Sequence, residues 1–167
     1  ENGPVLDRLR EKAVAAGHTS PAWHPRTRPS IVEGEAVSRF LRIADLAGAP
    51  AWIVHLSTAD GMSEIRAARE RGQQVLVESC PQYFTLTEEV YNKPEFEGAK
   101  YVCSPPLRPQ SDQDALWQAL ENGEIDILST DHCSFNFKGQ KEMGRDDFTK
   151  IPNGMPGIEH RPTVMYT

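Results

Sequence analysis

The amino-acid sequence predicts an α/β fold built on a parallel β-sheet. Three short apolar runs, at residues 52–57, 74–79 and 125–130, have the length and composition of buried strands, and each follows a segment with helical periodicity. Alternation of this kind joins parallel strands through right-handed crossovers. A Rossmann-like sheet and a (β/α)8 barrel both fit the order. No Gly-x-Gly-x-x-Gly motif follows a predicted strand, which weakens the dinucleotide-binding alternative.

The helical segments are recognised by apolar residues that recur every three or four positions. They cover residues 4–17, 33–47, 61–71 and 112–121. Ser111 is expected to cap the last helix, and Thr85 with Glu88 forms a capping-box signature for a further short helix. The prolines within residues 20–30 argue against a regular helix or central strand there, and residues 92–109 carry little regular signal.

The predicted strands are expected to be covered on both faces, because their apolar runs are nearly continuous rather than alternating. The chain of 167 residues contains 38% apolar and 25% charged residues, as in a globular domain. Its net charge of -6 argues against binding to nucleic acid or to an anionic membrane. The apolar runs are too short to span a bilayer, and the opening residues do not resemble a secretory signal.

The three cysteines lack the Cys-x-x-Cys spacing of a structural zinc site, and an odd number disfavours a disulfide framework. Reduced thiols in a cytoplasmic protein are therefore expected. Cys80 and Cys133 each follow a predicted strand and could face a site, although the role of a small buried thiol is favoured for both.

His55 and Asp131 are the main candidates for chemistry. Each lies at or near the carboxyl end of a predicted strand, where parallel α/β folds place their active sites. A neutral imidazole and a carboxylate both bind zinc or a similar divalent ion, and the carboxylate can also accept a proton. The hypothesis requires the two side chains to converge across neighbouring strand ends on one metal centre. A structural histidine and a helix-capping aspartate are the alternatives.

The remaining histidines are assigned no site role. His132 follows Asp131 directly and is expected to point to the opposite side of an extended segment, so we do not count it as a ligand. His18 and His24, next to or within the proline-rich loop, are expected to be surface residues.

Two loops could form the edge of a ligand pocket. Residues 101–108 contain Ser104 followed by two prolines, which favour an extended and rigid backbone, and residues 151–157 contain Asn153 in a Pro- and Gly-rich turn. Either loop could present main-chain groups to a ligand, and either could equally serve only as a structural connection.

Six segments of the chain resemble dihydropyrimidinases and bacterial hydantoinases, in the same order and at matching spacing. They are residues 52–57 (WIVHLS), 78–83 (ESCPQY), 100–108 (KYVCSPPLR), 129–133 (STDHC), 135–141 (FNFKGQK) and 148–154 (FTKIPNG). The resemblance runs essentially from end to end of the 167 residues.

The resemblance implies the C-terminal part of a (β/α)8 TIM-like barrel, with the three strands as its sixth, seventh and eighth, so that residues 1–167 form a partial barrel domain. It implies two divalent metal ions, usually Zn²⁺. His55 matches a ligand of one metal, and Asp131 matches a ligand of the other that also relays the proton. The segments that contain Ser104 and Asn153 match those that hold the ring of a small cyclic amide. The implied reaction is hydrolytic opening of a hydantoin or dihydropyrimidine, in a cytosolic homotetramer.

The family's other metal ligands are expected upstream of Glu1. They are a His-x-His pair, a carboxylated Lys and a further His, and an oxyanion-stabilising Tyr is expected there too. The 167 residues alone are therefore expected to bind metal weakly and to hydrolyse nothing. Allantoinase and dihydroorotase are related alternatives, although no Arg is evidently placed for a dihydroorotate carboxylate. A non-catalytic binding scaffold of the collapsin response mediator kind is the other alternative, and the presence of His55 and Asp131 argues against it.

Overall fold

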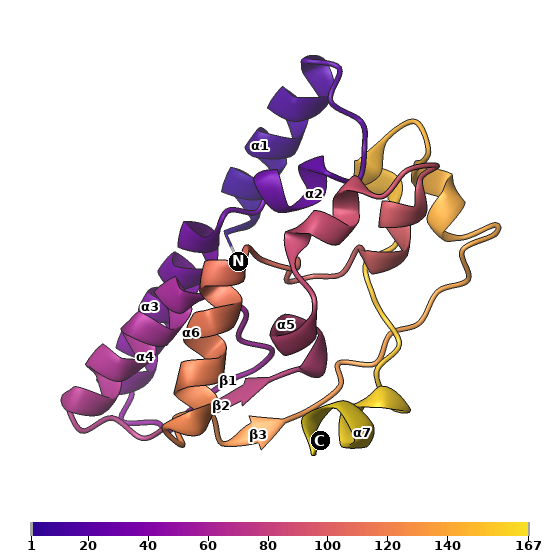
Figure 1. Ribbon diagram of the computed structural model, residues 1–167. Coiled ribbons are helices and arrows are strands. Elements are labelled where there is room, and N and C mark those ends of the chain that lie inside the picture. Colours follow the sequence, from indigo (N-terminus) through magenta and orange to yellow (C-terminus); the bar gives the residue numbers. More distant parts are fainter. Residues whose placement is uncertain (1, 167) are drawn as a thin grey trace.

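The computed structural model describes residues 2–166, so that Glu1 and Thr167 lie outside it, and it has an α/β architecture with a small parallel sheet (Figure 1). The strands are arranged in the order β1-β2-β3, and both outer strands run parallel to β2. Ala51 lies opposite Val75, and Ser79 lies opposite Leu128. The strands are β1 (Ala51–Ile53), β2 (Val75–Ser79) and β3 (Ile127–Leu128). The predicted parallel sheet is confirmed, although its outer strands are shorter than expected.

The four helices predicted from apolar periodicity are all present. They are α1 (Gly3–Ala15), α3 (Ser30–Leu46), α4 (Ala59–Glu70) and α6 (Gln110–Glu121). The shorter helical elements are α2 (Trp23–Arg26), α5 (Pro81–Thr85), α7 (His160–Met165) and the 3-10 helices η1 (Glu88–Asn92), η2 (Glu97–Tyr101), η3 (Lys141–Gly144) and η4 (Phe148–Lys150). No helix among residues 2–166 combines the length and the apolar character needed to cross a membrane.

Several local predictions were wrong at helix ends. Ser111 lies inside α6, whose N-cap is Pro109, and Thr85 ends α5 instead of beginning a helix. The proline-rich loop contains the single turn α2. Pro25 is tolerated there because the N–H groups of a first helical turn have no helical partner to lose. Residues 92–109, expected to lack regular structure, include η2.

The hydrophobic core lies on the helical side of the sheet. Helix α3 contacts β1 and α4 contacts β2, while α3 and α4 pack extensively on one another (Figure 1). The core includes Leu41 from α3, Met62 and Ile65 from α4, Val77 from β2 and Leu116 from α6, each at most 1% exposed.

The opposite face of the sheet is largely exposed. Trp52, Val54 and Leu76 alternate with buried strand residues and retain exposures of 52%, 45% and 49%. The expectation of strands covered on both faces is therefore wrong for residues 2–166, because the side chains that alternate outward meet no comparable layer of helices.

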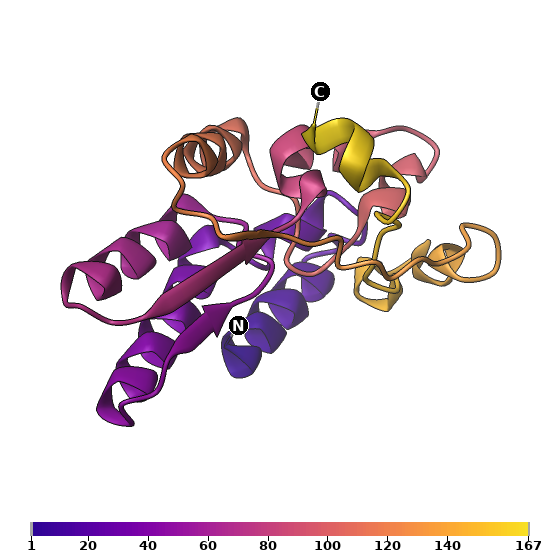
Figure 2. The same cartoon turned by 90° about the horizontal axis from the view of Figure 1, so that it is seen from below.

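The carboxyl ends of the strands point toward the half of the molecule that holds α5 and α7. Figure 2 shows this arrangement from below, with the tip of β2 next to α5 and the loop after β3 running toward α7. The residues that follow all three strands are thereby gathered in one region, which is where parallel α/β folds place their functional groups.

Candidate functional site

His55 and Asp131 follow β1 and β3, and both have a left-handed backbone. Their φ angles are 41° and 46°. This conformation costs free energy in a residue with a Cβ atom and is found preferentially at functional sites. Main-chain hydrogen bonds to β2 hold both turns: the Leu56 N–H donates to the Glu78 carbonyl at 2.8 Å, and the Ser129 N–H donates to the Ser79 carbonyl at 3.0 Å.

The side chains of His55 and Asp131 are available for a ligand. His55 is half-buried and Asp131 is exposed. Within residues 2–166 neither side chain forms a hydrogen bond or an ion pair. The two residues follow β1 and β3, which lie on either side of β2, so the strands that carry them are not neighbours as the hypothesis required.

The charge of Asp131 acts on residues at the end of β2. Burial raises the pKa of the Cys80 thiol to about 12, and the Asp131 carboxylate contributes to that rise. Burial likewise raises the pKa of Tyr83, with Asp131 again among the contributing charges. The chain before Asp131 contacts the end of the central strand directly, because Ser129 Oγ lies 3.3 Å from Cys80 Sγ.

An imidazole nitrogen and a carboxylate oxygen are suitable donors for a divalent metal such as zinc. A structural zinc site needs four ligands, and catalytic sites use three or more protein ligands. Among residues 2–166 no group of three or more His, Cys, Asp or Glu side chains is arranged to hold a metal ion. His55 and Asp131 have donor atoms of a suitable kind, but two side chains are fewer than a zinc site uses.

His132 has a structural role. Its Nδ1 atom accepts hydrogen bonds from the Gly157 N–H at 3.1 Å and from the Ile158 N–H at 3.4 Å, which fixes the loop before α7. Cys133 is exposed, contrary to the expectation of a buried thiol, whereas Cys80 is buried as expected.

His24 is buried, contrary to the expectation of a surface residue. It is 4% exposed, and its Nε2–H donates to the Cys103 carbonyl at 2.7 Å. Burial lowers the pKa of His24 to about 3, so the imidazole is neutral near pH 7. It supports the residue that precedes Ser104.

Ser104 and Asn153 lie on two segments that are joined directly to one another. The Gly154 N–H donates to the Val102 carbonyl at 2.9 Å. Ser104 is half-buried, its hydroxyl accepts a hydrogen bond from Arg28 Nη1 at 2.9 Å, and its peptide bond to Pro105 is cis. The exposed Asn153 donates weakly to the Ile151 carbonyl at 3.4 Å.

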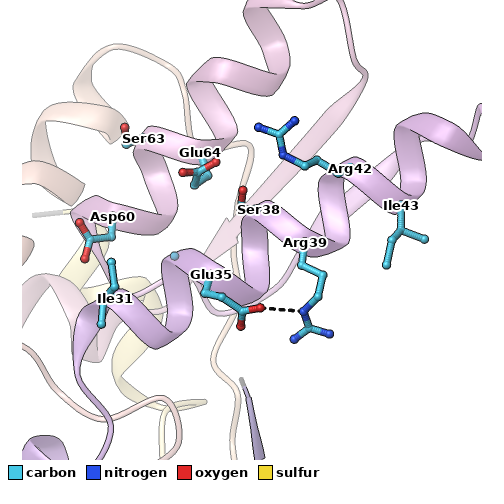
Figure 3. Close-up of a pocket in the computed structure, with 10 residues that line it drawn as sticks. Ile31, Glu35, Ser38, Arg39, Arg42, Ile43, Asp60, Ser63 and Glu64 are labelled. Carbon is cyan, nitrogen blue, oxygen red and sulfur yellow. Dashed lines mark hydrogen bonds and ion pairs between the residues drawn. The ribbon is translucent and has the colours of Figure 1, made fainter. Parts of the chain in front are cut away.

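A groove of about 570 Å³ lies elsewhere, between the outer faces of α3 and α4 (Figure 3). Charged and small polar side chains from both helices surround it together with Ile31 and Ile43 of α3, and Glu35 pairs with Arg39 along one wall at 2.8 Å. None of the four candidate site residues lines this groove. It is therefore separate from the strand ends.

Known proteins match this chain over its whole length. It is 51% identical to the D-hydantoinase of Geobacillus stearothermophilus over 167 residues, which cover 100% of the chain and 36% of the relative. It is 40% identical to the D-phenylhydantoinase of Escherichia coli O81, with the same two coverages. No family model matches the sequence.

Solved structures of hydantoinases and a dihydropyrimidinase also superimpose on this chain. The dihydropyrimidinase of Brevibacillus agri superimposes with a TM-score of 0.98 at 53% identity, covering 100% of this chain and 36% of that one. The L-hydantoinase of Arthrobacter aurescens superimposes with a TM-score of 0.85 at 34% identity, over 95% of this chain and 34% of that one. The chain belongs to the D-hydantoinase/dihydropyrimidinase family.

The resemblance to the D-hydantoinase/dihydropyrimidinase family noted in the sequence is thereby confirmed. The 167 residues span about a third of the length of the hydantoinases that they match.

Sequence reasoning missed a buried network behind the His55 turn of this hydantoinase-family chain. The carboxylate of Glu33 accepts from the Ser57 N–H at 2.8 Å, from Thr58 Oγ1 at 3.2 Å and from Arg108 Nη2 at 3.2 Å. Glu33 and Arg108 are 7% and 5% exposed. The position of Glu33, one turn before Val37 on the buried stripe of α3, was the available signal.

Proposed function

We propose that these 167 residues are part of a longer metal-dependent hydrolase that opens the ring of a hydantoin or dihydropyrimidine. The observation that carries the proposal is the 51% identity over the whole chain to a protein named D-hydantoinase. It is supported by the placement of His55 and Asp131 after two parallel strands, with side chains that have no partner within residues 2–166.

In the proposed enzyme, His55 and Asp131 are two of the ligands of a centre with two divalent ions, most simply Zn²⁺. Such ions would supply Lewis-acid polarisation of the ring carbonyl. Asp131 would also take a proton from the attacking water and return it to the leaving ring nitrogen, a role that needs an exposed carboxylate within reach of the substrate. The exposure of Asp131 in this chain supports that role.

The ring of the cyclic amide would be held by main-chain groups near Ser104 and Asn153. The hydrogen bond between Gly154 and Val102 joins the two segments, which supports a shared pocket edge. Cys80 and Cys103 are not nucleophiles in this scheme, because burial raises the pKa of each thiol to about 12 and the reactive thiolate is scarce near pH 7.

The wider architecture is part of the same proposal. Residues 1–167 would form the section of a (β/α)8 barrel that contains its last three strands, and the exposed face at Trp52, Val54 and Leu76 would pack inside that barrel. The net charge of -6 is compatible with a cytoplasmic enzyme, and a homotetramer is proposed from the resemblance alone.

The test uses the full-length protein that contains these residues, purified with its native metal content. Metal is measured by mass spectrometry, and ring opening is followed with hydantoin and dihydrouracil. We expect His55→Ala to lower the bound metal, and Asp131→Asn to lower kcat by about 10²–10⁴-fold, the usual contribution of a general acid–base group.

The exposed His160 provides a matched control, because His160→Ala removes an imidazole that lies on α7. This variant should keep wild-type metal content and turnover. A wild-type protein without bound metal and without turnover of either substrate would contradict the hydrolase proposal and favour a non-catalytic scaffold. Turnover of allantoin in place of these substrates would redirect the substrate assignment.

A further inference from the structure

Lys141 is a buried lysine with no carboxylate partner among residues 2–166. It begins η3, is 2% exposed, and its Nζ atom lies 5.5 Å from the centre of the Phe135 ring. Burying an ammonium group is costly unless its N–H groups are all satisfied. Here they are satisfied by three main-chain carbonyls: those of Val102 at 2.7 Å, Pro152 at 2.7 Å and Gly154 at 2.9 Å.

The three carbonyls belong to the two segments proposed to hold the substrate. Val102 lies two residues before Ser104, and Pro152 and Gly154 lie on either side of Asn153. The ammonium group therefore bonds the backbone on both sides of Asn153 and two residues before Ser104.

The segment around Gly154 is also held from its far side. A Cβ atom on Gly154 would lie 2.2 Å from the carbonyl oxygen of Cys133, so this backbone is in close contact with the residue two positions after Asp131. The Cys133 N–H donates to the Met155 carbonyl at 3.0 Å. Residues 154 and 155 are therefore held by Cys133 on one side and by Lys141 on the other.

The charge state of Lys141 matches the number of its acceptors. Burial lowers the pKa of Lys141 to about 8. The group is thus mostly protonated at neutral pH and offers three N–H donors to three carbonyls.

We propose that Lys141 is a positioning residue that fixes residues 102–105 and 151–154 relative to one another, so that both can hold one ring. The proposal rests on the proposed function for its catalytic consequence, but the clamp itself is a property of the described contacts. Because Lys141 bonds only main-chain carbonyls of these two segments and neither His55 nor Asp131, its loss should weaken substrate binding more than the chemical step.

The test compares Lys141→Met and Lys141→Gln in the full-length protein with Lys138→Met, which removes an exposed lysine from the same loop. Met has no donor and Gln has two N–H groups on one nitrogen, so we expect a graded effect. KM for the cyclic amide should rise about tenfold for Met and less for Gln, with kcat lowered no more than about threefold and metal content unchanged. Lys138→Met should match the wild type.

Amide hydrogen exchange provides a readout that does not need activity. The Gly154 and Cys133 N–H groups should exchange faster in both Lys141 variants than in the wild type, and at the wild-type rate in Lys138→Met. If Lys141→Met does not fold, Lys141→Gln decides the question by the same two measurements.

The outcomes separate the clamp from the proposed function. Unchanged exchange together with unchanged KM in the Lys141 variants would overturn the clamp, even in an active hydrolase. If the wild type shows no turnover, the proposed function fails, and faster exchange at Gly154 and Cys133 would still establish the clamp. A fall in kcat equal to that in kcat/KM, with KM unchanged, would also overturn the positioning role.

Discussion

Replacing Glu33 by Gln should destabilise the fold strongly, although the two side chains have nearly the same shape. Glu33 is the carboxylate partner of Arg108 at 3.2 Å, and the pair has side-chain exposures of 9% and 5%. The change removes the charge and leaves a buried guanidinium without a carboxylate. Breaking a buried pair in this way costs about 3 kcal/mol, at the lower end of the usual range because the Gln amide oxygen can still accept hydrogen bonds.

The matched control lies two residues further along α3. Glu35 pairs with Arg39 at 2.8 Å in a solvent-exposed position, with side-chain exposures of 43% and 54%. Glu35→Gln should leave stability unchanged within error, since solvent screens such a pair. The comparison therefore separates the effect of a buried charge from that of any Glu→Gln change in this helix.

The assay is the urea midpoint of the full-length protein, followed by fluorescence and by circular dichroism, for the wild type and both variants. Glu33 also holds Ser57 and Thr58, which follow His55, so metal content should fall in Glu33→Gln and not in Glu35→Gln. Equal midpoints for the Glu33 variant and the wild type would refute the reasoning, because the buried Arg108 would then have no need of its partner.

Two further predictions concern pH and the isolated chain. The pKa of His24 is lowered from 6.5 to about 3 in the folded protein, so the unfolded chain binds more protons between these values and stability falls as the pH drops below 6.5. By pH 5 the free energy of unfolding should be lower by about 2 kcal/mol. The variant His24→Gln keeps a donor for the Cys103 carbonyl, and its urea midpoint should depend less steeply on pH than that of the wild type. Parallel curves for the two proteins would count against a neutral buried imidazole. The 167 residues alone should not open dihydrouracil or hydantoin, because no three metal-binding side chains among residues 2–166 are arranged to hold a metal ion and one face of the sheet remains exposed. Measurable turnover by the isolated chain would contradict this prediction.

The helices, the parallel sheet and the placement of His55 and Asp131 after two of its strands could be predicted from the amino-acid sequence. Helical periodicity is a local property, and α1, α3, α4 and α6 were therefore predicted to within a few residues. His55 and Asp131 each follow an apolar run in the sequence. They could therefore be predicted to lie at one edge of the sheet, because the carboxyl ends of parallel strands share that edge.

Which polar residues are buried could not be predicted from the sequence. Lys141 lies in a charged loop and resembles a surface lysine until its acceptor is found 39 residues earlier in the chain, and Arg108 meets Glu33 across 75 residues. His24 became a buried donor in the same way, through a contact with Cys103. Burial of a polar group depends on whether a distant part of the chain supplies its partner, and no local pattern encodes that distance.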